Sequence, residues 1–243
     1  MISIEGLSKS YGTLRAVRDV SFSAQNGQVT GLLGPNGAGK TTTLRMLSSL
    51  VRPDAGRALV DGIDVAQAPH QALARLGVLP DGRGLYPRLT AREHLEYYGA
   101  LHGLSRAALA ARISHLVELL DMASIIDRRV LGFSQGERTK VAIARALVHD
   151  PANVVLDEAT NGLDVMSTRG MRTVIRELCG RGACILFSSH VMQEVSELCD
   201  HIVVFAGGRV VADGTPEALR QATGESNLEE AFMKIIGTGV GLA

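Results

Sequence analysis

The sequence carries no net charge, because its 25 lysines and arginines balance its 25 aspartates and glutamates. Proteins that bind nucleic acid usually present a basic surface, so this balance gives no support to a nucleic-acid partner. Long apolar runs are also missing. The longest, such as 183–187 and 202–206, fall far short of the ~20 residues that a membrane-spanning helix needs. Their length suits buried strands instead.

Two other features are scarce or absent. The first residues, 1–5, lack the basic and apolar regions of a signal peptide, so we expect the chain to remain in the cytoplasm. The only cysteines are Cys179, Cys184 and Cys199, and neither their spacing nor their odd number suits a metal site or a disulfide framework. We interpret them as packing residues. A length of 243 residues with 46% hydrophobic content allows one large domain or two small ones.

The stretch that says most about chemistry is 34–41, with the sequence GPNGAGKT, which fits the phosphate-binding pattern G-x-x-x-x-G-K-T. A short apolar run at 29–33 precedes it and is expected to be a buried strand. Leu44 and Leu47 follow at helical spacing. A strand, a glycine-rich loop and a helix in this order are the context that the pattern requires. A ligand-free glycine-rich turn is the alternative interpretation.

The glycines of this loop allow backbone N–H groups to converge on phosphate oxygens, at a helix start whose dipole also favours an anion. We predict that Lys40 reaches the β- and γ-phosphates of a nucleotide and that the Thr41 hydroxyl binds Mg²⁺. The predicted phosphate-binding residues are Gly34, Pro35, Asn36, Gly37, Ala38, Gly39, Lys40, Thr41 and Thr42.

Two later strand ends carry groups suited to hydrolysis. Asp157 and Glu158 close the apolar run 153–158. Because Mg²⁺ prefers oxygen ligands, we predict that Asp157 binds it, usually through water, and that Glu158 polarises the water that attacks the γ-phosphate. His190 follows another apolar run, and a neutral imidazole there could hydrogen-bond the γ-phosphate or that water. Considered without the phosphate loop, Asp157 and Glu158 could simply begin a turn, and His190 could be a structural histidine.

Two helix starts have the spacing of a capping box, Thr90 with Glu93 and Ser134 with Glu137. The second of them could be no more than a well-capped helix. A helix N-terminus with serine and glycine is nevertheless also an anion site. Because one nucleotide has one γ-phosphate, this second site could serve a nucleotide held by another copy of the chain.

The order of the segments predicts an α/β fold. An opening hairpin has Tyr11 near its turn, where the ring either stacks on a flat base or packs on a strand. Strands then alternate with helices, which implies a mostly parallel sheet with ligands at its carboxyl edge. We expect a domain over residues 1–220, with a helical subdomain inserted at about 86–150, and a C-terminal amphipathic helix and tail at 221–243 that packs on the domain.

This arrangement resembles the ATP-binding subunits of ABC transporters over nearly the whole chain. The resemblance implies a P-loop NTPase fold with a RecA-like core, an N-terminal antiparallel β part and an inserted helical subdomain. It also implies ATP and Mg²⁺ as cofactors, and ATP hydrolysis with Lys40, Glu158 and His190 as catalytic residues. The motifs that carry it, in the family's order, are Tyr11 as a base-stacking aromatic, 34–42, the loop at Asp81, the signature 133–137, the acidic strand end 154–158, the dimer-contacting loop 161–164 and His190 as the switch histidine.

By the same resemblance, Asp81 would be a Mg²⁺ ligand, and a second subunit's nucleotide would contact Ser134, Gln135, Gly136, Glu137 and Asp164. The chain departs from the family at two motifs. Asp81 stands where glutamine is usual, and the signature is Phe-Ser-Gln-Gly-Glu where Leu-Ser-Gly-Gly-Gln is usual. Ser134 and Gly136, which form the anion-binding helix start, are retained.

The resemblance also implies partners. Two copies, most simply a homodimer, would enclose two ATP molecules head to tail and drive a separate integral membrane permease from the cytoplasmic face of the membrane. The stretches 84–90 and 132–151 are most similar to exporter-type subunits, notably the sodium-extruding Nat-type and drug-exporting groups. Two alternatives are a soluble ABC ATPase acting on ribosomes or DNA, and a regulatory nucleotide-binding module without turnover.

Overall fold

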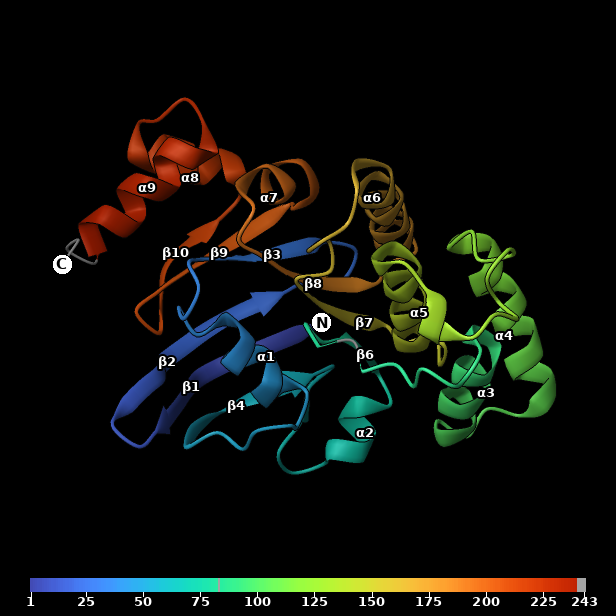
Figure 1. The fold of residues 1–243 in the computed structure, drawn as a ribbon. Coiled ribbons are helices and arrows are strands. Elements are labelled where there is room, and N and C mark those ends of the chain that lie inside the picture. Colours follow the sequence, from blue (N-terminus) through green and yellow to red (C-terminus); the bar gives the residue numbers. More distant parts are fainter. Residues whose placement is uncertain (83, 240–243) are drawn as a thin grey trace.

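Two β-sheets and the helices around them make up the computed structural model in Figure 1, which describes residues 1–82 and 84–239. Arg83 of the predicted loop at Asp81 and residues 240–243 of the predicted tail lie outside the described residues. The strands are β1 (Ile2–Tyr11), β2 (Leu14–Ala24), β3 (Val29–Leu33), β4 (Ala55–Val60), β5 (Ile63–Asp64), β6 (Leu76–Leu79), β7 (Asn153–Asp157), β8 (Cys184–Ser189), β9 (His201–Ala206) and β10 (Arg209–Gly214). The helices are α1 (Lys40–Leu47), α2 (Pro69–Leu73), α3 (Ala91–Leu101), α4 (Arg106–Leu119), the 3₁₀ turn η1 (Val130–Gly132), α5 (Gln135–Leu147), α6 (Val165–Gly180), α7 (Met192–Leu198), α8 (Pro216–Thr223) and α9 (Leu228–Gly239).

The N-terminal sheet has the strand order β2-β1-β4-β5. The predicted opening hairpin is confirmed, because β1 and β2 pair antiparallel with Tyr11 opposite Leu14 at the turn. Alternate residues of β1, including Ile2 and Ile4, are buried in the hydrophobic cluster beneath the sheet. The period-2 pattern of a strand with one buried face therefore sets the register of the hairpin.

The larger sheet has the order β10-β9-β3-β8-β7-β6. All neighbouring pairs from β9 to β6 are parallel, and only the edge strand β10 is antiparallel, so the predicted mostly parallel sheet is confirmed. Every residue of β3, β7 and β8 is buried. Strands buried on both faces need apolar residues at nearly every position, which is why these segments are short unbroken apolar runs.

The larger sheet separates two hydrophobic clusters. Along β8, Ile185 and Phe187 belong to the cluster under α5, α6 and α7, whereas Cys184 and Leu186 belong to the cluster that contains α1 and the N-terminal sheet. In Figure 1 the helices α5, α6 and α7 accordingly lie on one side of the sheet, and α1 with β1 and β2 lies on the other. Cys184 and Cys199 pack in these cores as free thiols.

The helical block contains the two predicted capping boxes. Thr90 Oγ1 accepts a hydrogen bond from Glu93 N at 3.1 Å while Glu93 accepts one from Thr90 N at 2.7 Å, and Ser134 and Glu137 make the same reciprocal pair. Helix α3 ends before Gly103, whose φ of +76° suits a glycine stop. The block shares its core with the sheet, since the buried Leu95 and Leu116 belong to the same cluster as the strand residues.

The C-terminal helix α9 packs on the domain, as predicted. Leu228 and Ala231 are buried in the larger cluster, and Phe232, Ile235 and Ile236 pack partly buried against it. In Figure 1, α8 and α9 lie at one end of the molecule and the helical block at the other. Within the described part of the chain, none of the helices is both long and apolar enough to cross a membrane.

The contact between β6 and α5 depends on Gly77. A Cβ on Gly77 would lie 2.4 Å from the carbonyl oxygen of Ala146 and 2.8 Å from a ring carbon of Pro151. We predict that Gly77→Ala destabilises the fold by roughly 1–3 kcal/mol, the range for forcing an extra methyl group into a packed core. Chemical unfolding would measure this loss.

Gly170 is the matched control, because a Cβ there meets nothing within 4 Å and the residue lies within α6. Gly170→Ala should stabilise the fold by up to about 1 kcal/mol, since alanine loses less entropy in a helix. Equal stability of the two variants would contradict this account of the contact between β6 and α5.

Candidate phosphate-binding and catalytic site

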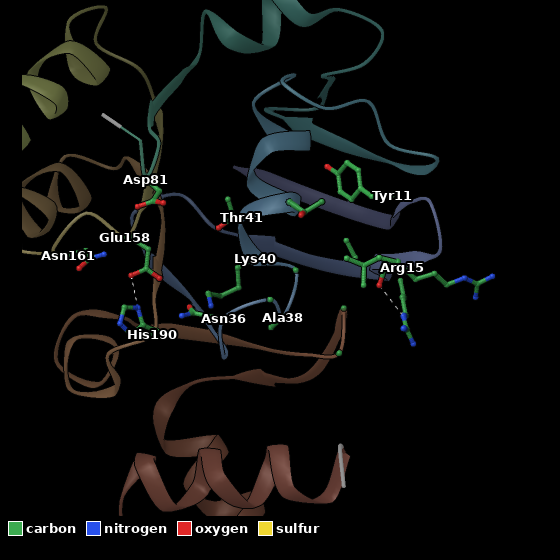
Figure 2. Close-up of a pocket in the computed structure, with 18 residues that line it drawn as sticks. Tyr11, Arg15, Asn36, Ala38, Lys40, Thr41, Asp81, Glu158, Asn161 and His190 are labelled. Atoms are coloured by element: carbon green, nitrogen blue, oxygen red, sulfur yellow. Dashed lines mark hydrogen bonds and ion pairs between the residues drawn. The ribbon is translucent and has the colours of Figure 1, made fainter. Parts of the chain in front are cut away.

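A cleft of about 520 Å³ opens at the carboxyl edge of the larger sheet (Figure 2). Most of the predicted site residues line it, although they come from elements far apart in the sequence. In Figure 2, Tyr11 and Arg15 lie at one end of the cleft and Glu158 and His190 at the other. The predicted residues that line it are Tyr11, Asn36, Gly37, Ala38, Gly39, Lys40, Thr41, Thr42, Asp81, Glu158 and His190.

The phosphate loop is held between β2 and the turn that joins β9 to β10. Gly208 N donates a hydrogen bond to Ala38 O at 3.1 Å, and Arg18 N donates to Gly208 O at 2.7 Å. Gly39 has φ +105°, and a Cβ there would lie 2.6 Å from Ala16 O. Only glycine fits this position, because a side chain would be strained by the backbone conformation and would also clash.

The start of α1 is open to an anion. Within the described chain, no side chain caps α1, so no capping group competes with an anion for its first N–H groups. Lys40 is 5% exposed and its ammonium donates to the carbonyl oxygens of Gly34 and, at 3.2 Å, Pro35. Burial lowers the pKa of Lys40, while the Glu158 and Asp157 carboxylates oppose that shift. Gly34 and Pro35 do not line the cleft. Their carbonyl oxygens instead hold the side chain of Lys40, which does line it.

Asp157, the last residue of β7, lies in a smaller cavity of about 60 Å³ beside the cleft, and Thr41 and Asp81 line both. Its Oδ1 atom is buried and makes no hydrogen bond to any described residue. Burial raises the pKa of Asp157, and the Asp81 charge acts in the same direction. A buried carboxylate oxygen without a partner, beside a hydroxyl and a second carboxylate, is a set of oxygen ligands that fits a hydrated Mg²⁺.

Glu158 and His190 meet across two neighbouring strand ends, with His190 Nδ1 2.9 Å from Glu158 Oε2. Glu158 has φ +50°, which is uncommon for a residue with a side chain. Its N–H donates to Ser188 O at 3.1 Å, which holds this turn against β8. Burial raises the pKa of Glu158, although the nearby His190 works against that shift. A carboxylate with a raised pKa is a stronger proton acceptor.

The structure adds cleft residues that the sequence patterns did not indicate. They are Leu14, Arg15, Ala16, Arg18, Gly207 and Gly208, and the cleft also contains Asn161, which the sequence indicated only as part of the dimer-contacting loop. Arg15 and Arg18 bring positive charge to the end of the cleft that holds Tyr11, whose side chain is 45% exposed. From the sequence, β2 and β9–β10 could be recognised only as strands next to turns. Their meeting at the phosphate loop is a tertiary contact, which local patterns do not specify.

The predicted signature residues and Asp164 do not line the cleft. Ser134, Gln135, Gly136 and Glu137 form the start of α5, where Glu137 also pairs with Arg128 at 2.9 Å. Asp164 caps α6 by accepting a hydrogen bond from Ser167 N at 2.8 Å. A Cβ on Gly136 would lie 3.0 Å from Ser167 Oγ, so the two helix starts lie side by side. Their contact with a second subunit's nucleotide stays a prediction.

The buried Asp157 charge should destabilise the nucleotide-free fold at neutral pH. The pKa of Asp157 is higher in the folded chain than in the unfolded chain. Protonation of Asp157 at low pH therefore favours the folded state, and this contribution to stability is lost as the pH rises through the pKa of the folded chain. We predict that, in a metal-chelating buffer, Asp157→Asn unfolds at a higher temperature than the wild type at pH 7.5. The difference should shrink as the pH falls and the Asp157 carboxylate becomes protonated.

Asp164→Asn provides a control of opposite sign. The hydrogen bond from Ser167 N lowers the pKa of Asp164, so its charge favours the folded state at neutral pH. This variant should show no gain in melting temperature at pH 7.5. Equal melting temperatures for the wild type and Asp157→Asn at pH 7.5 would contradict the prediction that the buried Asp157 charge destabilises the fold.

Comparisons with known proteins show which families and folds the chain resembles. A family model described as "ABC transporter" matches residues 17–161. The chain is similar to the ABC transporter ATP-binding protein NatA of Bacillus subtilis, with 46% identity over 93% of each chain. It is also similar to the daunorubicin resistance ATP-binding protein DrrA3 of Streptomyces coeruleorubidus, with 36% identity over 100% of this chain and 77% of the relative.

Another relative is the Nod factor export ATP-binding protein I of Ralstonia nicotianae, 40% identical over 90% of this chain and 68% of that protein. Among solved structures, one described as the ATP-binding subunit of an ABC transporter superposes with a TM-score of 0.90 and 29% identity, covering 97% of this chain and 99% of the other. The likeness thus covers both the fold and most of the chain.

Proposed function

Because the chain belongs to the ABC transporter family, whose ATP-binding subunits hydrolyse ATP, we propose that it powers outward transport through a separate membrane protein. The observation that carries the proposal is the cleft where the phosphate loop, Glu158 and His190 converge. Relatives named for Nod factor export and for daunorubicin resistance support the outward direction. Sodium or a drug is the proposed cargo, and the cytoplasmic face of the membrane is the proposed location.

We propose that ATP lies along the cleft with its phosphates on the loop and at the start of α1. Lys40 would exchange its bonds to Gly34 and Pro35 for bonds to the β- and γ-phosphates. Tyr11 would stack on adenine, which its partial exposure at the end of the cleft allows. Mg²⁺, held by Thr41 and Asp157, with Asp81 nearby, would neutralise phosphate charge.

For hydrolysis, Glu158 is the proposed acceptor of the proton from the attacking water. Its raised pKa and its position across from Lys40 support this role. His190 Nδ1 contacts the carboxylate at Oε2. When a γ-phosphate enters, the imidazole would turn to it, and the freed Oε2 would accept the hydrogen bond from water.

The requirement for Lys40 tests the catalytic part of the proposal. Lys40→Ala removes the only cation of the phosphate loop and should lower ATP turnover by roughly 100-fold or more, the scale for losing one charge-stabilising group. Lys234→Ala, on the exposed face of α9, should keep wild-type turnover. Phosphate release would be measured for all three proteins. Full turnover by Lys40→Ala would contradict the proposed catalytic site. Absence of ATP turnover by the wild type would favour the alternative of a regulatory nucleotide-binding module.

ATP-binding cassettes of this family pair with a membrane subunit and dimerise. For this chain we propose a head-to-tail homodimer. The support is that Ser134 to Glu137 form an ordered helix start that lies outside the chain's own cleft. A nucleotide bound by one copy would then contact the α5 start and Asp164 of the other.

The dimer can be tested by blocking hydrolysis. Glu158→Gln keeps the size of the side chain but removes its charge, so ATP should remain bound and shift this variant from monomer to dimer in light scattering. Adding Ser134→Arg should abolish the shift and leave ATP binding unchanged, because Ser134 would contact only the partner's nucleotide.

A matched control is Ser105→Arg in the same Glu158→Gln background. Ser105 is also a helix cap, since its side chain accepts a hydrogen bond from Ala108 N at 3.3 Å, but it starts α4. The control should still dimerise with ATP. Dimerisation of the Ser134→Arg protein to the same extent would exclude α5 as the second half of the site.

A further inference from the structure

A buried carboxylate lies behind the catalytic cleft. Glu194 belongs to α7 and is 8% exposed. Its Oε2 atom accepts hydrogen bonds from Thr160 Oγ1 at 2.6 Å and from Ser189 Oγ at 2.9 Å. Both hydroxyl residues are buried as well. Glu194 does not line the cleft, so it cannot touch a nucleotide there directly.

The two hydroxyls lie next to the proposed catalytic residues, one in the loop after β7 and one at the end of β8. Thr160 follows Glu158 by two positions in the loop after β7, and Ser189 immediately precedes His190 at the end of β8. These loops are therefore joined twice. The bond between His190 and Glu158 joins them on the cleft side, and Glu194 joins them on the buried side.

We propose that Glu194 is a positioning residue for ATP hydrolysis, whose carboxylate keeps the loop of Glu158 in register with the loop of His190. The inference rests on the proposed catalytic roles of Glu158 and His190. It adds a residue to the site that has no contact with the nucleotide and acts only through its two hydroxyl partners.

The cleft-side bond alone is poorly suited to hold the loops together. The His190 side chain is 46% exposed, and in the mechanism proposed above its bond to Glu158 opens when the imidazole turns to a γ-phosphate. The bonds to Glu194 lie away from water and need not change when ATP binds. Bonds to an ionised acceptor are also stronger than those between neutral groups. They can preserve the spacing of the loops while the inner bond is broken.

A carboxylate suits this position because it only accepts hydrogen bonds, which obliges both hydroxyls to donate to it. The Ser189 oxygen is then free to accept, and Val191 N donates to it at 3.0 Å. The backbone is thus held on both sides of His190. The network therefore determines where the imidazole leaves the sheet, as well as how far apart the two loops lie.

The test compares three substitutions in α7 by steady-state ATP hydrolysis. Glu194→Ala should lower kcat at least tenfold, with the KM for ATP and the affinity for a fluorescent ATP analogue within about twofold of wild type, because the phosphate loop follows a different strand. Glu194→Gln should retain kcat within about threefold, since its amide oxygen can accept both hydrogen bonds. Glu197→Ala, on the exposed side of the same helix, should leave kcat unchanged.

If Glu194→Ala fails to fold, Thr160→Val and Ser189→Ala remove the donors one at a time. Each should lower kcat without changing ATP affinity, and their effects should be less than additive because both act through one oxygen. Equal losses in Glu194→Gln and Glu194→Ala would overturn the positioning role, as would unchanged kcat in Glu194→Ala and in both donor variants. The catalytic site is tested separately from Glu194, because it requires only that the wild type hydrolyses ATP and that Lys40→Ala does not. Absence of wild-type turnover would instead refute the proposed function itself.

Discussion

The parallel pairing of β3 with β8 and of β8 with β7 is the constraint on which the site depends. Leu33 pairs with Ser189, and Asp157 pairs with Ser188, so the three strands end at the same edge of the sheet. The phosphate loop, Glu158 and His190 follow directly after those ends, and Asp157 is itself the last residue of β7. Because the strands pack against a hydrophobic core on each face, a slip in register would move side chains into positions shaped for other residues, so the positions of the loops are well determined.

The cleft at that edge concentrates charge that the protein alone leaves poorly compensated. Burial lowers the pKa of Lys40 and raises the pKa values of Asp157 and Glu158, so in all three groups burial disfavours the charged form. A polyanion with a divalent cation would bring the opposite charges to each of these groups. The same features that make the nucleotide-free cleft costly therefore favour the ligand that the family binds.

The regions around the cleft show how the fold supports this chemistry. One hydrophobic cluster extends from the strands into the helical block, so the start of α5 is held by the same core as β7 and β8. The β9–β10 turn contacts Ala38 from the other side, and Glu194 of α7 accepts hydrogen bonds from Thr160 after β7 and from Ser189 at the end of β8. The loops that carry the proposed catalytic residues are thus anchored by several separate elements of the fold.

Local patterns in the sequence predicted much of this protein. The glycines and Lys40 of the phosphate loop, the capping boxes at Thr90 and Ser134, and the strand ends at Asp157 and before His190 all depend on residues a few positions apart. Such signals are set by backbone conformation and hydrogen bonding within one or two turns of chain, and they are confirmed as elements of the structure. The chemical identity of the site follows largely from them.

Only the tertiary structure decided which of these elements meet. The bond between Glu158 and His190, the clamp of Gly208 on the phosphate loop, and the two bonds to Glu194 join residues brought together by strand order. Periodicity shows that a segment is a strand with a buried face, but it does not specify its neighbour. The sequence therefore did not indicate that Arg15 and Arg18 line the cleft. Nor did it distinguish Glu194 from other acidic residues on helices, because its burial and its two hydroxyl partners are set by the fold.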